Sequence, residues 1–170
     1  MIKPENFNKS PYKEYQNILG EVFHTEIKSL DNTVAKTITL QVTEDCNFAC
    51  SYCYQHNKTS NHMNFEIAKQ IIDNCIHDSE ILDNYLAIIL DIIGGEPFLE
   101  IKLIEQIADY FFSELSKIDF LMASRSRISI ISNGSLYFTP DVQNFLDKYK
   151  NFVSFNITLD GYKELHDSCR

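Results

Sequence analysis

Three of the five cysteines in the chain lie within eight residues, at Cys46, Cys50 and Cys53. This C-x3-C-x2-C spacing allows one short loop to bring three thiols to a common centre. Thiolate is the soft ligand that iron–sulfur clusters and zinc prefer. Three unrelated core cysteines are the less favoured interpretation, because the surrounding residues are polar and cysteines at ligand spacing are usually metal ligands. We therefore predict a metal or iron–sulfur centre in residues 46–53.

Two kinds of centre suit this spacing. Zinc could take His56 as a fourth ligand and complete a Cys3His site. A four-iron cluster held by three cysteines would instead leave one iron open to a substrate or cofactor, as catalysis requires. The loop follows a predicted strand of a larger sheet and does not lie in a small zinc ribbon. This favours the cluster, and zinc remains the alternative.

A second polar turn, residues 94–97, follows the next predicted strand. Gly94 and Gly95 allow the backbone to approach a small ligand closely and expose N–H groups. Glu96 offers a carboxylate to an ammonium group, and Pro97 can begin the next helix. Two glycines before a proline are also a common turn, so this motif is informative only together with its neighbours.

Hydroxyl, amide and carboxylate groups also follow the third and fourth predicted strands. Ser132 and Asn133 precede one turn glycine, and Thr158 and Asp160 precede another. Taken singly, either segment is more often a turn than a ligand site. Four polar strand ends, one of which carries three thiols, together predict a binding site at one end of a sheet.

The elements that must position these residues follow from the apolar pattern. Apolar runs that alternate or continue over several residues predict strands, and apolar positions at three- and four-residue steps predict helices between them. Strands are expected at residues 37–43, 86–93, 127–132 and 153–160, and helices begin at an Asn64 cap, at Phe98 and at a Thr139 cap. Cys75 falls on the apolar face of the first helix and is predicted to be a core residue.

This βαβαβαβ order predicts an α/β fold with a parallel sheet and right-handed crossovers. The first and fourth strands each carry a whole polar face, whereas a central strand of a doubly wound sheet is apolar on both faces. We therefore expect a partial (β/α) barrel with helices outside, ending after about four strands. Residues 1–35 are expected to form an N-terminal extension and residues 36–170 the barrel part.

The composition excludes several classes of partner. Fifteen Lys and Arg against 24 Asp and Glu give a formal charge of -9, which opposes binding to nucleic acid. The longest apolar stretch, residues 85–93, has about half of the roughly 20 residues that a membrane helix needs. The N-terminus lacks the apolar region of a secretory signal, and the cysteine count is odd. We therefore expect a cytoplasmic protein with reduced thiols, Cys169 among them, and no membrane partner.

The chain resembles the radical S-adenosylmethionine (radical SAM) enzymes, and within them the peptide-maturase branch with a C-terminal SPASM-type domain. The three clustered cysteines match the family's C-x3-C-x2-C signature, and residues 94–97 match its GGEP motif. Residues 132–134, Ser-Asn-Gly, resemble its third-strand motif. Residues 159–161 and 164–167 resemble the DG…HD run after its fourth strand. The resemblance covers about residues 36–170.

The resemblance implies that Cys46, Cys50 and Cys53 hold a [4Fe-4S] cluster and that S-adenosyl-L-methionine (SAM) binds beside it. Tyr52 would pack near the adenine, and residues 94–97 would bind the methionine amino group. The further cofactor contacts would be Ser132, Asn133, Thr158 and Asp160. The implied reaction is reductive cleavage of SAM to a 5′-deoxyadenosyl radical, which would modify a ribosomally made peptide. The cofactors carry this chemistry, and no catalytic side chain is assigned.

Members of the family continue with further barrel strands and a Cys-rich domain, whereas this chain ends at Arg170. The resemblance therefore implies the N-terminal part of a larger enzyme, inactive or weakly active alone. A flavodoxin- or ferredoxin-type protein would supply the electron. Two other functions remain open, namely anaerobic sulfatase maturation and a zinc-stabilised binding module without catalysis.

Overall fold

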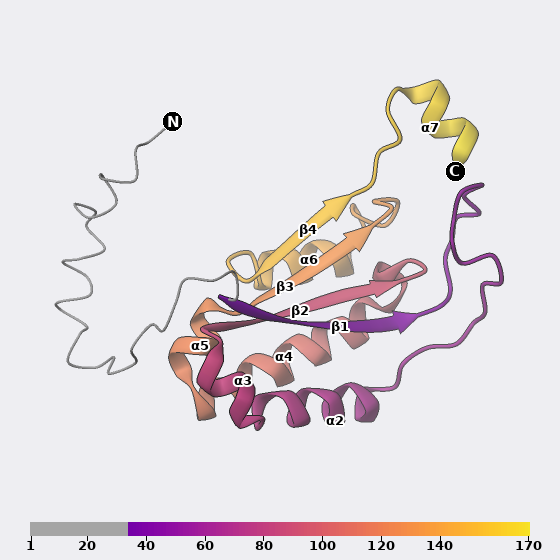
Figure 1. The fold of residues 1–170 in the computed structure, drawn as a ribbon. Helices are drawn as coiled ribbons and strands as arrows, with labels where there is room; N and C mark the ends of the chain where they lie inside the picture. Colours follow the sequence, from indigo (N-terminus) through magenta and orange to yellow (C-terminus); the bar gives the residue numbers. More distant parts are fainter. Residues whose placement is uncertain (1–33) are drawn as a thin grey trace, which may run out of the picture. The chain divides into compact units, whose positions relative to one another are not determined.

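A parallel sheet of four strands organises residues 34–170, the part of the chain that the computed structural model describes. The strands are β1 (Ala35–Thr43), β2 (Ala87–Gly94), β3 (Arg127–Ser132) and β4 (Val153–Ile157). They lie in the order β1-β2-β3-β4, and each pairs in parallel with the strand before it (Figure 1). In a (β/α) barrel each strand lies next to the strand that precedes it in the sequence, whereas in a doubly wound sheet the strand order reverses at one point. The strand order seen here is that of a barrel, so the predicted fold class is confirmed. The expected extension of residues 1–35 lies almost entirely outside the described residues.

The helical layer covers one face of this sheet. It consists of α2 (Phe65–Ile76), α4 (Ile101–Ile118) and α6 (Pro140–Lys148) (Figure 1). In β1, Leu40 and Val42 are buried, whereas Thr39 and Gln41 are exposed. Because side chains alternate along a strand, the apolar face packs in the core and the polar face stays open. The open polar face continues across the sheet, since Thr39, Asp91, Ser129 and Ser154 lie in register on the four strands.

The core between sheet and helices is apolar. Phe111 of α4 and Phe145 of α6 are its largest fully buried side chains. Cys75 is partly buried and packs against this core, and burial raises the pKa of its thiol. This cysteine therefore takes the packing role that its helical position predicts. Within residues 34–170, no helix combines the length and apolar character needed to cross a bilayer.

Two helix N-termini were predicted from capping residues, and the structure confirms both positions but only one of the caps. The side chain of Asn64 accepts the N–H of Ile67 at 2.9 Å, so α2 begins at the predicted cap. Thr139 precedes Pro140 at the start of α6 as predicted, but its hydroxyl donates to the carbonyl of Leu136 at 2.8 Å. The predicted position of this helix start is confirmed, whereas the predicted side-chain cap is wrong.

Several short elements differ from the predicted ones. Two six-residue helices, α3 (Ser79–Asn84) and α5 (Phe120–Arg125), were not expected. The helix expected from Phe98 begins as a tight 3-10 turn, η2 (Pro97–Glu100), before α4. Strand β4 ends at Ile157 and not at residue 160, and α7 (Lys163–Cys169) follows it. The segment between β4 and α7 thereby becomes a loop at the predicted site.

Candidate functional site

The carboxyl ends of the four strands meet at one edge of the sheet, as parallel strands require (Figure 1). The segment with Cys46, Cys50 and Cys53 follows β1 and is called the cysteine loop below. Residues 94–97 lie at the end of β2, residues 132–135 at the end of β3, and residues 158–161 after β4. The fold thus brings the four polar segments singled out in the sequence to the same edge.

The cysteine loop packs tightly against the turn after β2. Gly95 donates its N–H to the carbonyl of Thr43 at 3.0 Å, and Glu96 donates its N–H to the carbonyl of Asp45 at 2.8 Å. A Cβ at Gly95 would lie 2.1 Å from the carbonyl oxygen of Asp45, which no side chain tolerates. The sequence suggested that this glycine admits a ligand. The structure gives it a nearer reason, which is the close approach of the backbone that leads into Cys46.

Glu96 is fully buried and its carboxylate is occupied by protein donors. One oxygen, Oε1, accepts the N–H of Phe98 at 3.0 Å and the hydroxyl of Ser132 at 2.9 Å. The other, Oε2, accepts the N–H of Asn133 at 2.8 Å. The side chain predicted to meet an ammonium group therefore joins the end of β2 to the end of β3.

Asn133 connects the end of β3 to the cysteine loop. Its Nδ2 donates to Oδ1 of Asn47 at 2.9 Å and lies 4.0 Å from Sγ of Cys46. Its Oδ1 accepts the N–H and the hydroxyl of Ser135 at 2.9 and 2.6 Å. The hydroxyl of Ser135 in turn accepts a bond from Asn47 at 2.8 Å, which closes a ring of side chains beside the first cysteine. Thr158 contributes a backbone bond to this edge, from its N–H to the carbonyl of Ser132 at 3.2 Å.

The three thiols of the cysteine loop are free and partly exposed. The N–H of Phe48 donates to Sγ of Cys46 at 3.4 Å, and the N–H of Cys53 donates to the carbonyl of Cys50 at 3.1 Å. Soft, accessible and unpaired sulfur donors on one loop fit an iron–sulfur cluster. Within residues 34–170, however, no three His, Cys, Asp or Glu side chains gather closely enough to hold a metal ion. The three thiol ligands therefore lie on one loop, but their sulfur atoms do not yet converge on a common centre.

Tyr52, between the second and third cysteines, is tied to the segment after β4. Its hydroxyl donates to Oδ2 of Asp160 at 2.7 Å, and this bond raises the pKa of the phenol. Arg170 donates from Nε to the same carboxylate oxygen at 2.5 Å. Hydrogen bonds from Arg170 and Tyr52 lower the pKa of Asp160, which holds it as an anion.

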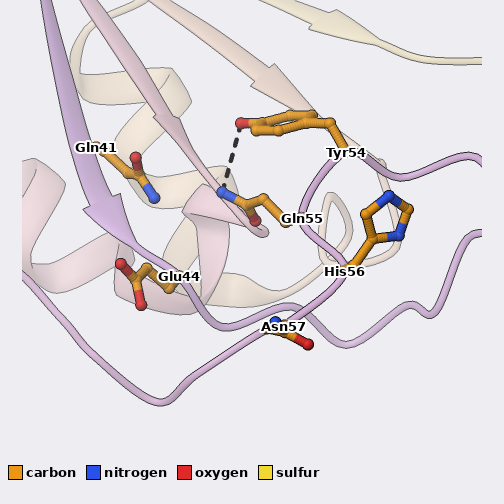
Figure 2. A pocket seen from close by; sticks show the side chains of 6 residues that line it. All are labelled: Gln41, Glu44, Tyr54, Gln55, His56 and Asn57. Atoms are coloured by element: carbon orange, nitrogen blue, oxygen red, sulfur yellow. Dashed lines mark hydrogen bonds between the residues drawn. The ribbon is translucent and has the colours of Figure 1, made fainter.

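Figure 2 shows where His56, the fourth ligand of the zinc alternative, lies. An open pocket of about 320 Å³ has Gln41 and Glu44 on one side and the loop with His56 on the other. Tyr54 and Gln55 point toward each other there, with a 3.4 Å contact between the amide nitrogen and the phenol. His56 thus lines a polar pocket at the end of β1 and forms no Cys3His group in residues 34–170.

Sequence reasoning missed several residues at this edge. Asn47, Ser135 and Arg170 bond to residues of the candidate site, yet nothing in their own positions singled them out. A second pocket, of about 470 Å³, lies between residues 47–49 of the cysteine loop and α7. It is lined by Asn47, Phe48, Ala49, His166, Asp167 and Arg170.

Comparison with known proteins also indicates an iron–sulfur domain. Residues 36–164 match the model of a family described as a 4Fe-4S single cluster domain. An uncharacterized protein of Methanocaldococcus jannaschii is 32% identical over 136 residues, which cover 79% of this chain and 42% of that protein. The S-adenosylmethionine-dependent nucleotide dehydratase of Selenomonas ruminantium is 29% identical over 75% of this chain and 40% of its own length. The radical SAM cyclopropyl synthase TigE of Paramaledivibacter caminithermalis is 30% identical, over 67% and 25%.

The chain spans about two fifths of the length of the first two of these relatives. Among solved structures, native anSMEcpe with bound AdoMet and Cp18Cys peptide matches with a TM-score of 0.62 and 21% sequence identity. The match covers 81% of this chain and 34% of that one. At this identity the likeness concerns the fold, and it agrees with the partial barrel seen here.

Proposed function

The match of residues 36–164 to the 4Fe-4S single cluster domain, together with the radical SAM relatives, shows that the chain belongs to the radical SAM family. We propose that it binds a [4Fe-4S] cluster and SAM at the cysteine-loop edge of the sheet. One observation carries the proposal. The loop with the three thiols and the Gly-Gly-Glu-Pro turn are joined directly, by the hydrogen bonds from Gly95 to Thr43 and from Glu96 to Asp45. Two motifs about 40 residues apart thereby lie side by side, which supports a shared site.

We assign the binding of the cluster and of SAM to the following residues. Cys46, Cys50 and Cys53 would be the cluster ligands, and Tyr52 would lie beside the adenine. Residues 94–97, Ser132, Asn133, Thr158 and Asp160 would form the rest of the SAM site. When bound, the cluster and SAM supply a 5′-deoxyadenosyl radical that abstracts hydrogen from a substrate. Glu96, whose carboxylate is buried among protein donors, would act by holding Ser132 and Asn133 in place.

We further propose that the substrate is a ribosomally made peptide. The similar solved structure holds a peptide, and the peptide-maturase branch shares all four motifs of this edge. The nucleotide dehydratase among the relatives supports a nucleotide as a second candidate. Measuring 5′-deoxyadenosine produced with Cys-containing peptides, with sulfatase-derived peptides or with nucleotides separates these substrate classes. Stimulation by nucleotides alone would contradict the peptide proposal.

The decisive experiment is anaerobic reconstitution with iron and sulfide, followed by metal analysis and a visible spectrum. The proposal expects about four iron and four sulfide per chain and a broad absorbance that bleaches on reduction. It then expects SAM to be cleaved when a flavodoxin- or ferredoxin-type reductant is present. A colourless protein with one zinc per chain would establish the zinc-stabilised module instead.

We propose that residues 1–170 alone turn over little, and that the reaction takes place in a reducing, cytoplasmic compartment. All five cysteines are free, which suits reduced thiols. The polar face of the sheet is open, and Ile157 at the end of β4 and Leu159 after that strand are exposed. An open site lets water and oxygen reach the cluster. Cleavage of SAM by this chain should therefore be slow compared with that of a protein as long as its relatives.

A further inference from the structure

We propose that Asp160, Arg170 and the backbone of Cys169 form a clamp that positions residues 50–53, the second half of the cysteine loop, for cluster binding. The inference rests on the proposed function, since it concerns the same loop. It assigns to α7 and the turn before it a task that neither the motifs nor the relatives specify. Asp160, proposed above as part of the SAM site, is in addition a positioning residue for the cysteine loop.

The first tie of the clamp is a backbone bond. The N–H of Ser51 donates to the carbonyl of Cys169 at 2.8 Å, and the hydroxyl of Ser51 lies 3.4 Å from the same oxygen. Ser51 follows Cys50 directly. The other main-chain bond in this stretch runs from Cys53 to Cys50, within the loop itself. The carbonyl of Cys169 therefore anchors the turn between two cluster ligands to a separate element.

The second tie runs through Asp160. Tyr52 and Arg170 donate to the same carboxylate oxygen, at 2.7 and 2.5 Å. The side chain of Arg170 is only 7% exposed, and its guanidinium lies 5.9 Å from the centre of the Tyr52 ring. A cation over an aromatic face adds to the charge-assisted hydrogen bonds. Tyr52 is thus held both at its hydroxyl and across its ring.

Asp160 is itself fixed within its segment. Its N–H donates to Nδ1 of His166 at 3.3 Å, across the turn that joins β4 to α7. The clamp contacts only the second half of the cysteine loop. Beside the first half, a pocket of about 470 Å³ separates residues 47–49 from α7. Space remains beside the first half of the loop while the second half is fixed.

A neighbouring tyrosine shows what the loop is like without such ties. Tyr54 lies two residues after Tyr52 and is 74% exposed, and in the described part of the chain its hydroxyl bonds only to the neighbouring side chain of Gln55. Ordering a loop costs conformational entropy, and a loop ordered beforehand binds its ligand with less of that cost. The three thiols are not gathered in this structure, so a clamp on Ser51 and Tyr52 reduces the freedom that cluster binding must still remove.

The test uses the cluster-free chain of residues 1–170. Tyr52→Phe removes only the hydroxyl that Asp160 accepts, and Asp160→Ala removes the acceptor. Tyr54→Phe is the matched control on the same loop, and Asp167→Ala is the control on α7, since Asp167 bonds only to Lys163 in the described residues. Mass spectrometry follows alkylation of each cysteine by iodoacetamide, with the core residue Cys75 as an internal reference. A second measurement follows iron retained by reconstituted variants under a chelator.

We expect alkylation of Cys50 and Cys53 to be about tenfold faster in Tyr52→Phe and Asp160→Ala, the factor that loss of one charge-assisted hydrogen bond allows. Cys75 should react at an unchanged rate, because the substitutions act only on the cysteine loop. General unfolding would instead accelerate the alkylation of Cys75 as well. Iron should be lost several-fold faster from the same two variants. Equal rates in Tyr52→Phe and Tyr54→Phe, or acceleration of Cys75 in parallel, would overturn the clamp. Iron binding that survives Cys50→Ala would instead overturn the proposed cluster site, so the two failures are distinct.

Discussion

The carboxylate of Glu96 accepts a hydrogen bond from the hydroxyl of Ser132 at 2.9 Å, and both side chains are buried. Glu96 lies in the turn after β2, at the N-cap of η2, and Ser132 is the last residue of β3. With the N–H of Asn133 on its second oxygen, this carboxylate joins two strand ends that carry separate motifs. The site at this edge is therefore built on a buried anion that protein donors satisfy.

Glu96→Ala should destabilise the fold strongly. The substitution leaves the N–H groups of Phe98 and Asn133 and the hydroxyl of Ser132 without their acceptor. Each buried donor left unpaired costs about 1–3 kcal/mol, so the free energy of unfolding should fall by about 3 kcal/mol or more. Urea denaturation measures this loss. Glu100→Ala, which removes a partly exposed carboxylate paired with His62, should cost under about 1 kcal/mol. Equal stability of the two variants would show that Glu96 has no structural role.

Gly95→Ala should impair the cysteine loop more than Gly94→Ala does. A Cβ at Gly95 meets the carbonyl of Asp45 at 2.1 Å, whereas a Cβ at Gly94 meets the carbonyl of Thr43 at 2.9 Å. The atoms nearest to a Cβ at Gly95 are all backbone atoms of Glu44 and Asp45. No flexible side chain can move aside, so the backbone that leads into Cys46 must shift. Iron content after reconstitution should fall in the order wild type, Gly94→Ala, Gly95→Ala. A Gly95→Ala chain with normal iron and weakened SAM binding would show that this glycine serves the cofactor instead.

Replacement of Cys46, Cys50 or Cys53 by Ala should abolish stable iron binding, because no other thiol lies on the loop. Cys75→Ala is the matched control. That thiol packs against the core, and its removal should cost stability but no iron. Iron and sulfide analysis with thermal denaturation separates the two effects. Full iron content in any of the three loop variants would contradict the ligand assignment.

Alkaline pH should weaken the contact between α2 and α4. The hydroxyl of Tyr110 donates to Asp73 at 2.5 Å, and this bond raises the pKa of the phenol from 10.0 to about 12. Because the pKa is higher in the folded state, the protonated phenol favours folding. Its contribution is complete below pH 10 and is lost as the pH rises from 10 to about 12. Absorbance of tyrosinate should show a step near pH 12 that is absent from Tyr110→Phe. Loss of a step near pH 10 in that variant would contradict the assignment.

Much of the fold was determined by the sequence alone, since strands and helices depend on local periodicity. The strand at residues 127–132 has the predicted bounds, and the cap at Asn64 accepts the expected N–H. The polar face of β1 and the order of elements were sufficient to predict a partial barrel. The six-residue helices α3 and α5 escaped because fewer than two helical turns offer too few positions for a period to appear.

The cysteine spacing and the four polar strand ends were likewise visible in the sequence, because each is a short contiguous motif. Which groups they meet was decided only by the tertiary structure. Ser132 reaches Glu96 across 36 residues and Asp160 reaches Tyr52 across 108, and neither spacing belongs to any local period. Register and parallel pairing bring these strand ends together, so the partners of Glu96 and Tyr52 exist only once the sheet has formed.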